Sequence, residues 1–77
     1  RMADRNDRLS INVTGKFYVD ESCIDCGQCP DSAPEFFGRD DDSGFSFVHR
    51  QPFGGDENRN AMEALTACPT DSIGNDG

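Results

Sequence analysis

Tryptophan, lysine, histidine and long hydrophobic runs are absent or rare in this sequence, and these shortages narrow the class of protein. With 34% hydrophobic residues among 77, the chain is one small domain whose core alone would be only marginally stable. Small domains of this kind are often stabilised by disulfide bonds or by a bound metal. No apolar run approaches the roughly 18 residues of a membrane-spanning helix. Residues 1–9 also lack the apolar stretch of a secretory signal, so we expect a soluble protein of the cytoplasm.

Positive charge is scarce as well. Seven basic residues stand against fifteen acidic ones, which gives a formal charge of −8. Nucleic acids and anionic membranes bind clustered Lys and Arg, so neither is expected as a partner. This charge favours a monomer that docks on a basic patch of a protein partner. Acidity that merely keeps the chain soluble would explain the composition equally well.

The N-terminal residues differ in composition from the rest of the chain. Residues 1–12 are polar, mixed in charge and aperiodic, which predicts a flexible tail. Arg1 precedes Met2, which suggests a remnant of protein expression. We therefore predict one folded domain over residues 13–77.

Within residues 13–77 the residue pattern predicts a small α+β domain. β-prone runs bounded by turn residues predict strands at 16–19, 35–38, 45–49 and 71–73. Helices are predicted at 30–34 and, after a capping Asp56, at 57–67. The order is βαββαβ, with one small antiparallel sheet, two helices and a ligand loop. The predicted core consists of four phenylalanines and one helix face: Phe36, Phe37, Phe45, Phe47, Ala61, Met62, Leu65 and Cys68.

The four cysteines carry the chemistry. Cys23, Cys26 and Cys29 form a C-x₂-C-x₂-C motif, and a remote Cys68 is followed directly by Pro69. A cubane iron–sulfur cluster takes one thiolate on each of its four irons. Three thiolates spaced two residues apart can bind three corners from one loop, while the distant cysteine binds the fourth.

Other uses of these cysteines fit the spacing less well. A structural zinc site usually takes two C-x₂-C pairs from two segments, whereas here three cysteines share one segment. Two disulfides are possible by count, but close pairs would strain the loop and a cytoplasmic chain keeps its thiols reduced. A catalytic dithiol would leave Cys29 and Cys68 without a role.

At this motif the chain resembles the bacterial-type ferredoxins, specifically the single-cluster 4Fe–4S members, over roughly residues 16–74. In two-cluster relatives the motif continues as x₃-C-P, and Ala33 stands where that extra cysteine would be. The resemblance implies a ferredoxin-like fold with one 4Fe–4S cluster. The implied cluster ligands are Cys23, Cys26, Cys29 and Cys68.

The resemblance also implies a function, namely electron transfer rather than enzymatic catalysis. A soluble one-electron carrier would cycle its cluster between the 2+ and 1+ states and pass electrons between redox proteins. Adding charge to a protein already at −8 is unfavourable, so we expect a potential on the order of −300 to −450 mV. A cluster module that senses oxygen or iron is the alternative, but it would need an effector surface that the sequence does not display.

Residues beside the cysteines are candidates for tuning and docking. Ile24, inside the loop, is expected to shield the cluster from water. The acidic residues nearest the ligands are the candidate docking residues: Asp20, Glu21, Asp25, Asp31 and Asp71.

Overall fold

Four short strands, two helices and one 3₁₀ turn make up the described part of the chain, residues 3–24 and 28–77 of a computed structural model. The class is α+β, as predicted. In chain order the elements are η1 (Arg5–Asp7), β1 (Tyr18–Val19), α1 (Gln28–Ser32), β2 (Phe37–Arg39), β3 (Ser46–Val48), α2 (Gly55–Ala67) and β4 (Ile73–Gly74). Among the described residues, no helix is both long and apolar enough to cross a bilayer.

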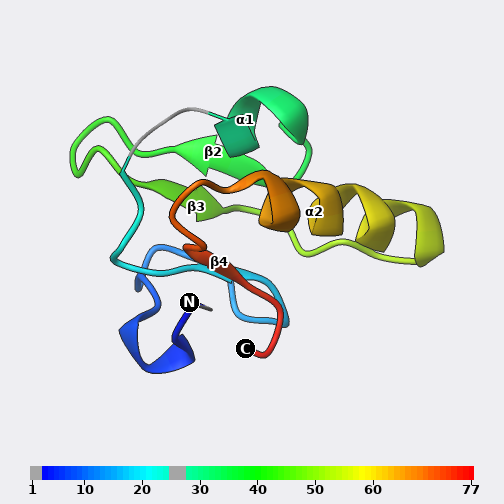
Figure 1. Cartoon of the computed structure of the whole chain (residues 1–77), viewed down its shortest axis with the longest axis horizontal. Coiled ribbons are helices and arrows are strands. Elements are labelled where there is room, and N and C mark those ends of the chain that lie inside the picture. Colours follow the sequence, from blue (N-terminus) through cyan, green and yellow to red (C-terminus); the bar gives the residue numbers. More distant parts are fainter. Residues whose placement is uncertain (1–2, 25–27) are drawn as a thin grey trace.

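The strands pair as two antiparallel two-stranded sheets (Figure 1), not as the one sheet predicted. β1 pairs with β4, so that Tyr18 lies opposite Gly74. β2 and β3 form a hairpin in which Phe37 lies opposite Val48. The sheets are adjacent because β1 packs against β3.

A side chain, rather than a backbone ladder, joins the two sheets. The Asn12 Oδ1 atom accepts hydrogen bonds from the backbone N–H groups of Val19 (3.2 Å) and Val48 (2.9 Å). Asn12 Nδ2 also donates to the Val19 carbonyl at 2.9 Å and to the Leu9 carbonyl at 2.8 Å. In a continuous sheet, backbone groups of β1 and β3 would pair with each other, whereas here they form hydrogen bonds to the side-chain amide of Asn12. Because the Asn12 amide takes the place of these backbone partners, β1 and β3 lie side by side without forming a ladder.

The N-terminal segment, predicted to be a flexible tail, lies against β1. Arg8 forms an isolated β-bridge with Asp20, and the Leu9 N–H donates to the Val19 carbonyl at 3.0 Å. The Leu9 side chain packs against the core. The segment has no hydrophobic period because backbone and amide hydrogen bonds, rather than an apolar face, hold most of it in place.

The hydrophobic core lies between the helices and the strands. Phe36 and Phe37 are fully buried, as predicted, whereas Phe45 and Phe47 are only half-buried. The buried face of α2 is made by Ala61 and Ala64. The core consists of Phe17, Val19, Cys29, Ala33, Phe36, Phe37, Val48, Ala61, Ala64 and Ile73.

Helix α2 positions the last cysteine. The helix begins at Gly55 after Gly54, whose φ is 86°, so the predicted side-chain cap by Asp56 is wrong. Asp56 instead lies in the first turn, where its charge suits the helix dipole. The helix ends at Ala67, and Pro69 cannot continue it because proline lacks the N–H group. Cys68 therefore leaves the helix in an extended conformation, with φ −66° and ψ 118°.

Candidate metal centre

Three of the four predicted ligands lie in the described residues. Cys23 follows β1, Cys29 lies in α1, and Cys68 is the C-cap of α2. Cys26 lies outside the described residues. In residues 3–24 and 28–77, no disulfide joins any of these three cysteines.

All three described cysteines border the same hydrophobic core. Cys29 belongs to the core and is 9% exposed, whereas Cys23 and Cys68 are half-buried and pack against it. Helix α1 packs on α2 (Figure 1), which brings the Cys29 segment to the helix that ends at Cys68. The fold therefore brings Cys68, which is distant in sequence, to the same core as the two described cysteines of the motif.

Cys29 is held by the short helix α1. Pro30 lies in its first turn, where a missing N–H costs no helical hydrogen bond. The Ala33 N–H donates to the Cys29 carbonyl at 2.9 Å. Ala33, at the position where two-cluster relatives have a cysteine, is 1% exposed and packs in the core. This position is thus filled by a methyl group.

Cys68 receives a hydrogen bond on its sulfur. The Ser72 N–H lies 3.3 Å from Cys68 Sγ, and the Thr70 hydroxyl lies 3.6 Å from the same atom. The turn closes as the Asp71 N–H donates to the Cys68 carbonyl, with Asp71 at φ 51°. An amide N–H stabilises negative charge on a ligand sulfur and so helps to set a cluster's potential.

The segments of Cys23 and Cys68 are tied together by their neighbours. The hydroxyls of Ser22 and Ser72 lie 2.7 Å apart, and the Asp20 N–H donates to the Ser72 carbonyl at 2.8 Å. The Cys23 N–H in turn donates to the Asp20 carbonyl at 3.3 Å. The β1–β4 pairing therefore continues into the ligand segments.

Asp20 is not a docking residue, contrary to the sequence-based expectation. It is 0% exposed, and its carboxylate accepts the N–H groups of Asp4 (3.0 Å) and Ser22 (2.9 Å). Buried carboxylates are rare unless hydrogen bonds compensate for lost hydration. The spacing of Asp20 and Ser22 is that of an Asx turn, which is the one sequence signal for this role. The roles of Ser72 and Thr70 carry no such signal.

The remaining candidates lie at the surface. Ile24, predicted to shield the centre, is 61% exposed and presents an apolar side chain beside Cys23. Glu21, Asp31 and Asp71 are exposed, as docking residues must be. Asp25 lies outside the described residues.

The donor set suits a cluster. Within residues 3–24 and 28–77, no three His, Cys, Asp or Glu side chains converge as they would around a single ion. A cubane makes a different demand, since each iron takes one thiolate and the ligands surround a larger group. The described cysteines are soft donors of the kind that iron–sulfur clusters take, and all three border one core.

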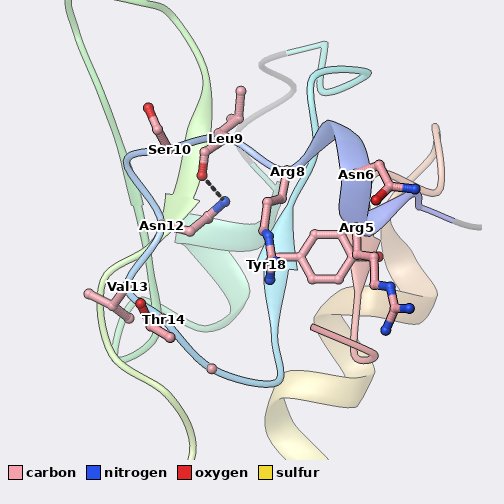
Figure 2. A pocket seen from close by; sticks show the side chains of 10 residues that line it. Arg5, Asn6, Arg8, Leu9, Ser10, Asn12, Val13, Thr14 and Tyr18 are labelled. Carbon is pink, nitrogen blue, oxygen red and sulfur yellow. Dashed lines mark hydrogen bonds between the residues drawn. The ribbon is translucent and has the colours of Figure 1, made fainter.

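A separate cavity of about 550 Å³ lies at the N-terminal segment and β1. Figure 2 shows the side chains that line it, between Arg5 and Tyr18 in sequence. The cysteines described above do not line it, so it belongs to a different surface from the candidate centre.

Comparison with known proteins bears on the nature of the centre. None of the curated proteins compared with the chain matches it. A family model described as the 4Fe-4S single cluster domain of Ferredoxin I matches residues 19–75, which is most of the chain and includes all four cysteines. With Cys68 on the same core as Cys23 and Cys29, this match shows that the chain belongs to the family of 4Fe-4S single cluster ferredoxin domains.

Proposed function

We propose that the protein is a one-electron carrier whose single 4Fe–4S cluster is held by Cys23, Cys26, Cys29 and Cys68. The observation that carries this proposal is the packing of the distant Cys68 against the same core as Cys23 and Cys29 of the motif. Membership of the ferredoxin family supports it, as does the element order β1, α1, β2, β3, α2, β4.

When bound, the cluster supplies a one-electron couple between its 2+ and 1+ states. The chain's own residues bind it, limit the access of water, and set its potential. Cys29 brings a buried thiolate, and the Ser72 amide offsets negative charge on Cys68. The overall charge of −8 opposes an additional electron. We expect these opposing effects to leave the potential on the order of −300 to −450 mV.

The surface beside Cys23 suggests the chemistry of the partner. Ile24 is an exposed apolar side chain, and Glu21 and Asp31 are exposed acids in the flanking segments. A redox protein with an apolar contact and a basic rim would complement this surface. We propose that the protein docks there as a monomer, in the reducing cytoplasm where its thiols remain available to iron.

Electron paramagnetic resonance of anaerobically prepared protein, before and after dithionite, tests the function. We expect a silent oxidised sample that acquires a spin-half signal on reduction, with four irons per chain. Serine substitution of each cysteine should abolish that signal, whereas Ser10→Ala, at an exposed hydroxyl near the separate cavity, should retain it. A signal already present in the oxidised sample would contradict the proposal, as would silence in both states.

A further inference from the structure

A row of hydroxyl groups joins Cys68 to a buried carboxylate. Cys68 Sγ lies 3.6 Å from Thr70 Oγ1, which lies 2.5 Å from Ser72 Oγ. Ser72 Oγ lies 2.7 Å from Ser22 Oγ, and Ser22 Oγ lies 2.5 Å from Asp20 Oδ1. The four contacts form one continuous path between a sulfur and a carboxylate that come from opposite ends of the domain sequence.

The Asp20 end determines the direction of these hydrogen bonds. Asp20 accepts hydrogen bonds from the Asp4 N–H, the Ser22 N–H and the Ser22 hydroxyl. Because the Ser22 hydrogen points to Asp20, the Ser22 oxygen can only accept from Ser72. Ser72 must in turn accept from Thr70.

Counting hydrogens gives the orientation at the other end. Three hydroxyls supply three hydrogens for four contacts, and the thiolate of a bound cysteine also only accepts. One contact must therefore lack a hydrogen. That contact is Thr70 to Cys68 Sγ, because the Thr70 hydrogen is directed to Ser72 Oγ at 2.5 Å. Thr70 thus turns an oxygen lone pair, rather than its hydrogen, toward the sulfur.

We propose that Asp20, acting through Ser22, Ser72 and Thr70, orients these hydroxyls and thereby lowers the reduction potential of the cluster. The inference rests on the proposed function, because it requires Cys68 to be a ligand. An oxygen lone pair beside the sulfur opposes the extra negative charge of the reduced state. The effect counteracts the Ser72 amide, which donates to the same sulfur. The residues between Asp20 and Cys68 are therefore positioning residues.

Removing the hydroxyl next to Asp20 reverses the effect, and this gives the test. In Ser22→Ala, the Ser72 hydroxyl loses the Ser22 oxygen to which it donates and can donate to Thr70 instead. The Thr70 hydrogen is then free to face the Cys68 sulfur. We expect the midpoint potential of the loaded protein, followed by electron paramagnetic resonance, to rise. Thr70→Val should also raise it, because the lone pair beside the sulfur is removed.

Matched controls separate this effect from a general loss of a hydroxyl. Ser10→Ala and Thr14→Val remove exposed hydroxyls on the N-terminal segment and should leave the potential unchanged. A loaded Ser22→Ala or Thr70→Val protein with an unchanged or lower potential would overturn the inference. If Ser22→Ala fails to fold, the Thr70→Val result decides. If the unaltered protein lacks the reduced-state signal, the proposed function itself fails, which is a separate outcome.

Discussion

The hydroxyl of Tyr18 donates a 2.6 Å hydrogen bond to the carboxylate of Asp76, 58 residues further along the chain. The same hydroxyl lies 3.1 Å from the Ala3 carbonyl oxygen. The residue is 1% exposed, although a tyrosine on a short strand is commonly expected to keep its hydroxyl in water. Burial, together with the Asp76 carboxylate, holds the pKa of Tyr18 well above its ordinary value.

This raised pKa makes stability depend on pH in the alkaline range. The neutral phenol is favoured in the folded state, so its contribution is fully present below the unfolded pKa of about 10 and is lost as pH rises toward the higher folded pKa. We expect urea unfolding to show a decline in stability above about pH 10. Tyr18 is the only tyrosine, so ultraviolet absorbance can follow its ionisation directly. Tyr18→Phe is the control; an ionisation near pH 10 in the folded protein would contradict this assignment.

Gly74 lies directly against the same ring. A Cβ atom at this position would lie 2.3 Å from both Tyr18 Cζ and Tyr18 Oη, and the buried ring has no room to move away. We expect Gly74→Ala to destabilise the domain by about 1–3 kcal/mol, as overpacked substitutions do. Gly55→Ala is the matched control, since nothing lies within 4 Å of its Cβ and alanine favours the helix. Equal unfolding free energies for the two variants would refute the close approach.

Asn12 joins the two sheets, and its removal should be costly. Asn12→Ala removes the acceptor of the Val19 and Val48 N–H groups, and it removes one of the donors to the carbonyls of Leu9 and Val19. We expect a loss of at least about 2 kcal/mol in unfolding free energy, because buried backbone groups left unpaired each cost about 1–3 kcal/mol.

Asn60→Ala, on the exposed face of α2, is the control for Asn12 and should be neutral or slightly stabilising. Chemical denaturation of both variants measures the difference. If the two variants unfold alike, the amide does not hold the sheets together.

Iron removal should unfold much of the domain. The proposed ligands Cys23 and Cys29 of the motif border the same core as the distant Cys68, so cluster binding and folding are linked. We expect chelated protein to lose cooperative thermal unfolding by circular dichroism and to regain it on reconstitution with iron and sulfide. Cys68→Ala should behave like the chelated protein. An apoprotein that melts cooperatively would show that the core is sufficient alone.

Charge reversal tests the proposed docking surface. Glu21→Lys combined with Asp31→Lys should slow electron transfer to a basic redox partner by about tenfold at low salt. The difference should shrink as salt screens the charges. Asp56→Lys combined with Glu63→Lys, on α2, changes the net charge equally and should have a smaller effect. Equal slowing by both pairs, measured by stopped-flow absorbance, would mean that only net charge matters.

The sequence predicts the features that depend on spacing or hydrophobic pattern. The cysteine motif and its distant partner lead to the family, and the strands predicted at 35–38 and 45–49 overlap β2 and β3. The longer helix is also where predicted, although its buried face uses Ala64 while Met62 is 37% exposed. These features have strong local signals.

The features that the sequence does not predict depend on polar side chains that replace backbone partners. Asn12 separates one expected sheet into two, and Gln51 contributes similarly by accepting from the Phe17 N–H at 2.9 Å and donating to the Phe17 carbonyl at 2.8 Å. The sequence does not show whether the side-chain amide of an Asn or Gln in a loop faces water or pairs with a strand. The burial of Asp20 has only a partial signal, because Ser22 gives the spacing of an Asx turn whereas the Asp4 N–H donates from a residue distant in sequence.

The pairing of β1 with β4 also determines when the chain can complete its folding during synthesis. Residue 18 finds its partner only when residue 74 has been made, and Ser22 finds Ser72 at the same stage. Until then, a nascent chain carries the proposed ligands Cys23 and Cys29 without the segment that closes the site. Contacts so distant in sequence form late and slowly. We therefore expect insertion of the cluster to follow translation of residue 74, with the thiols of Cys23 and Cys29 exposed to oxidation until then.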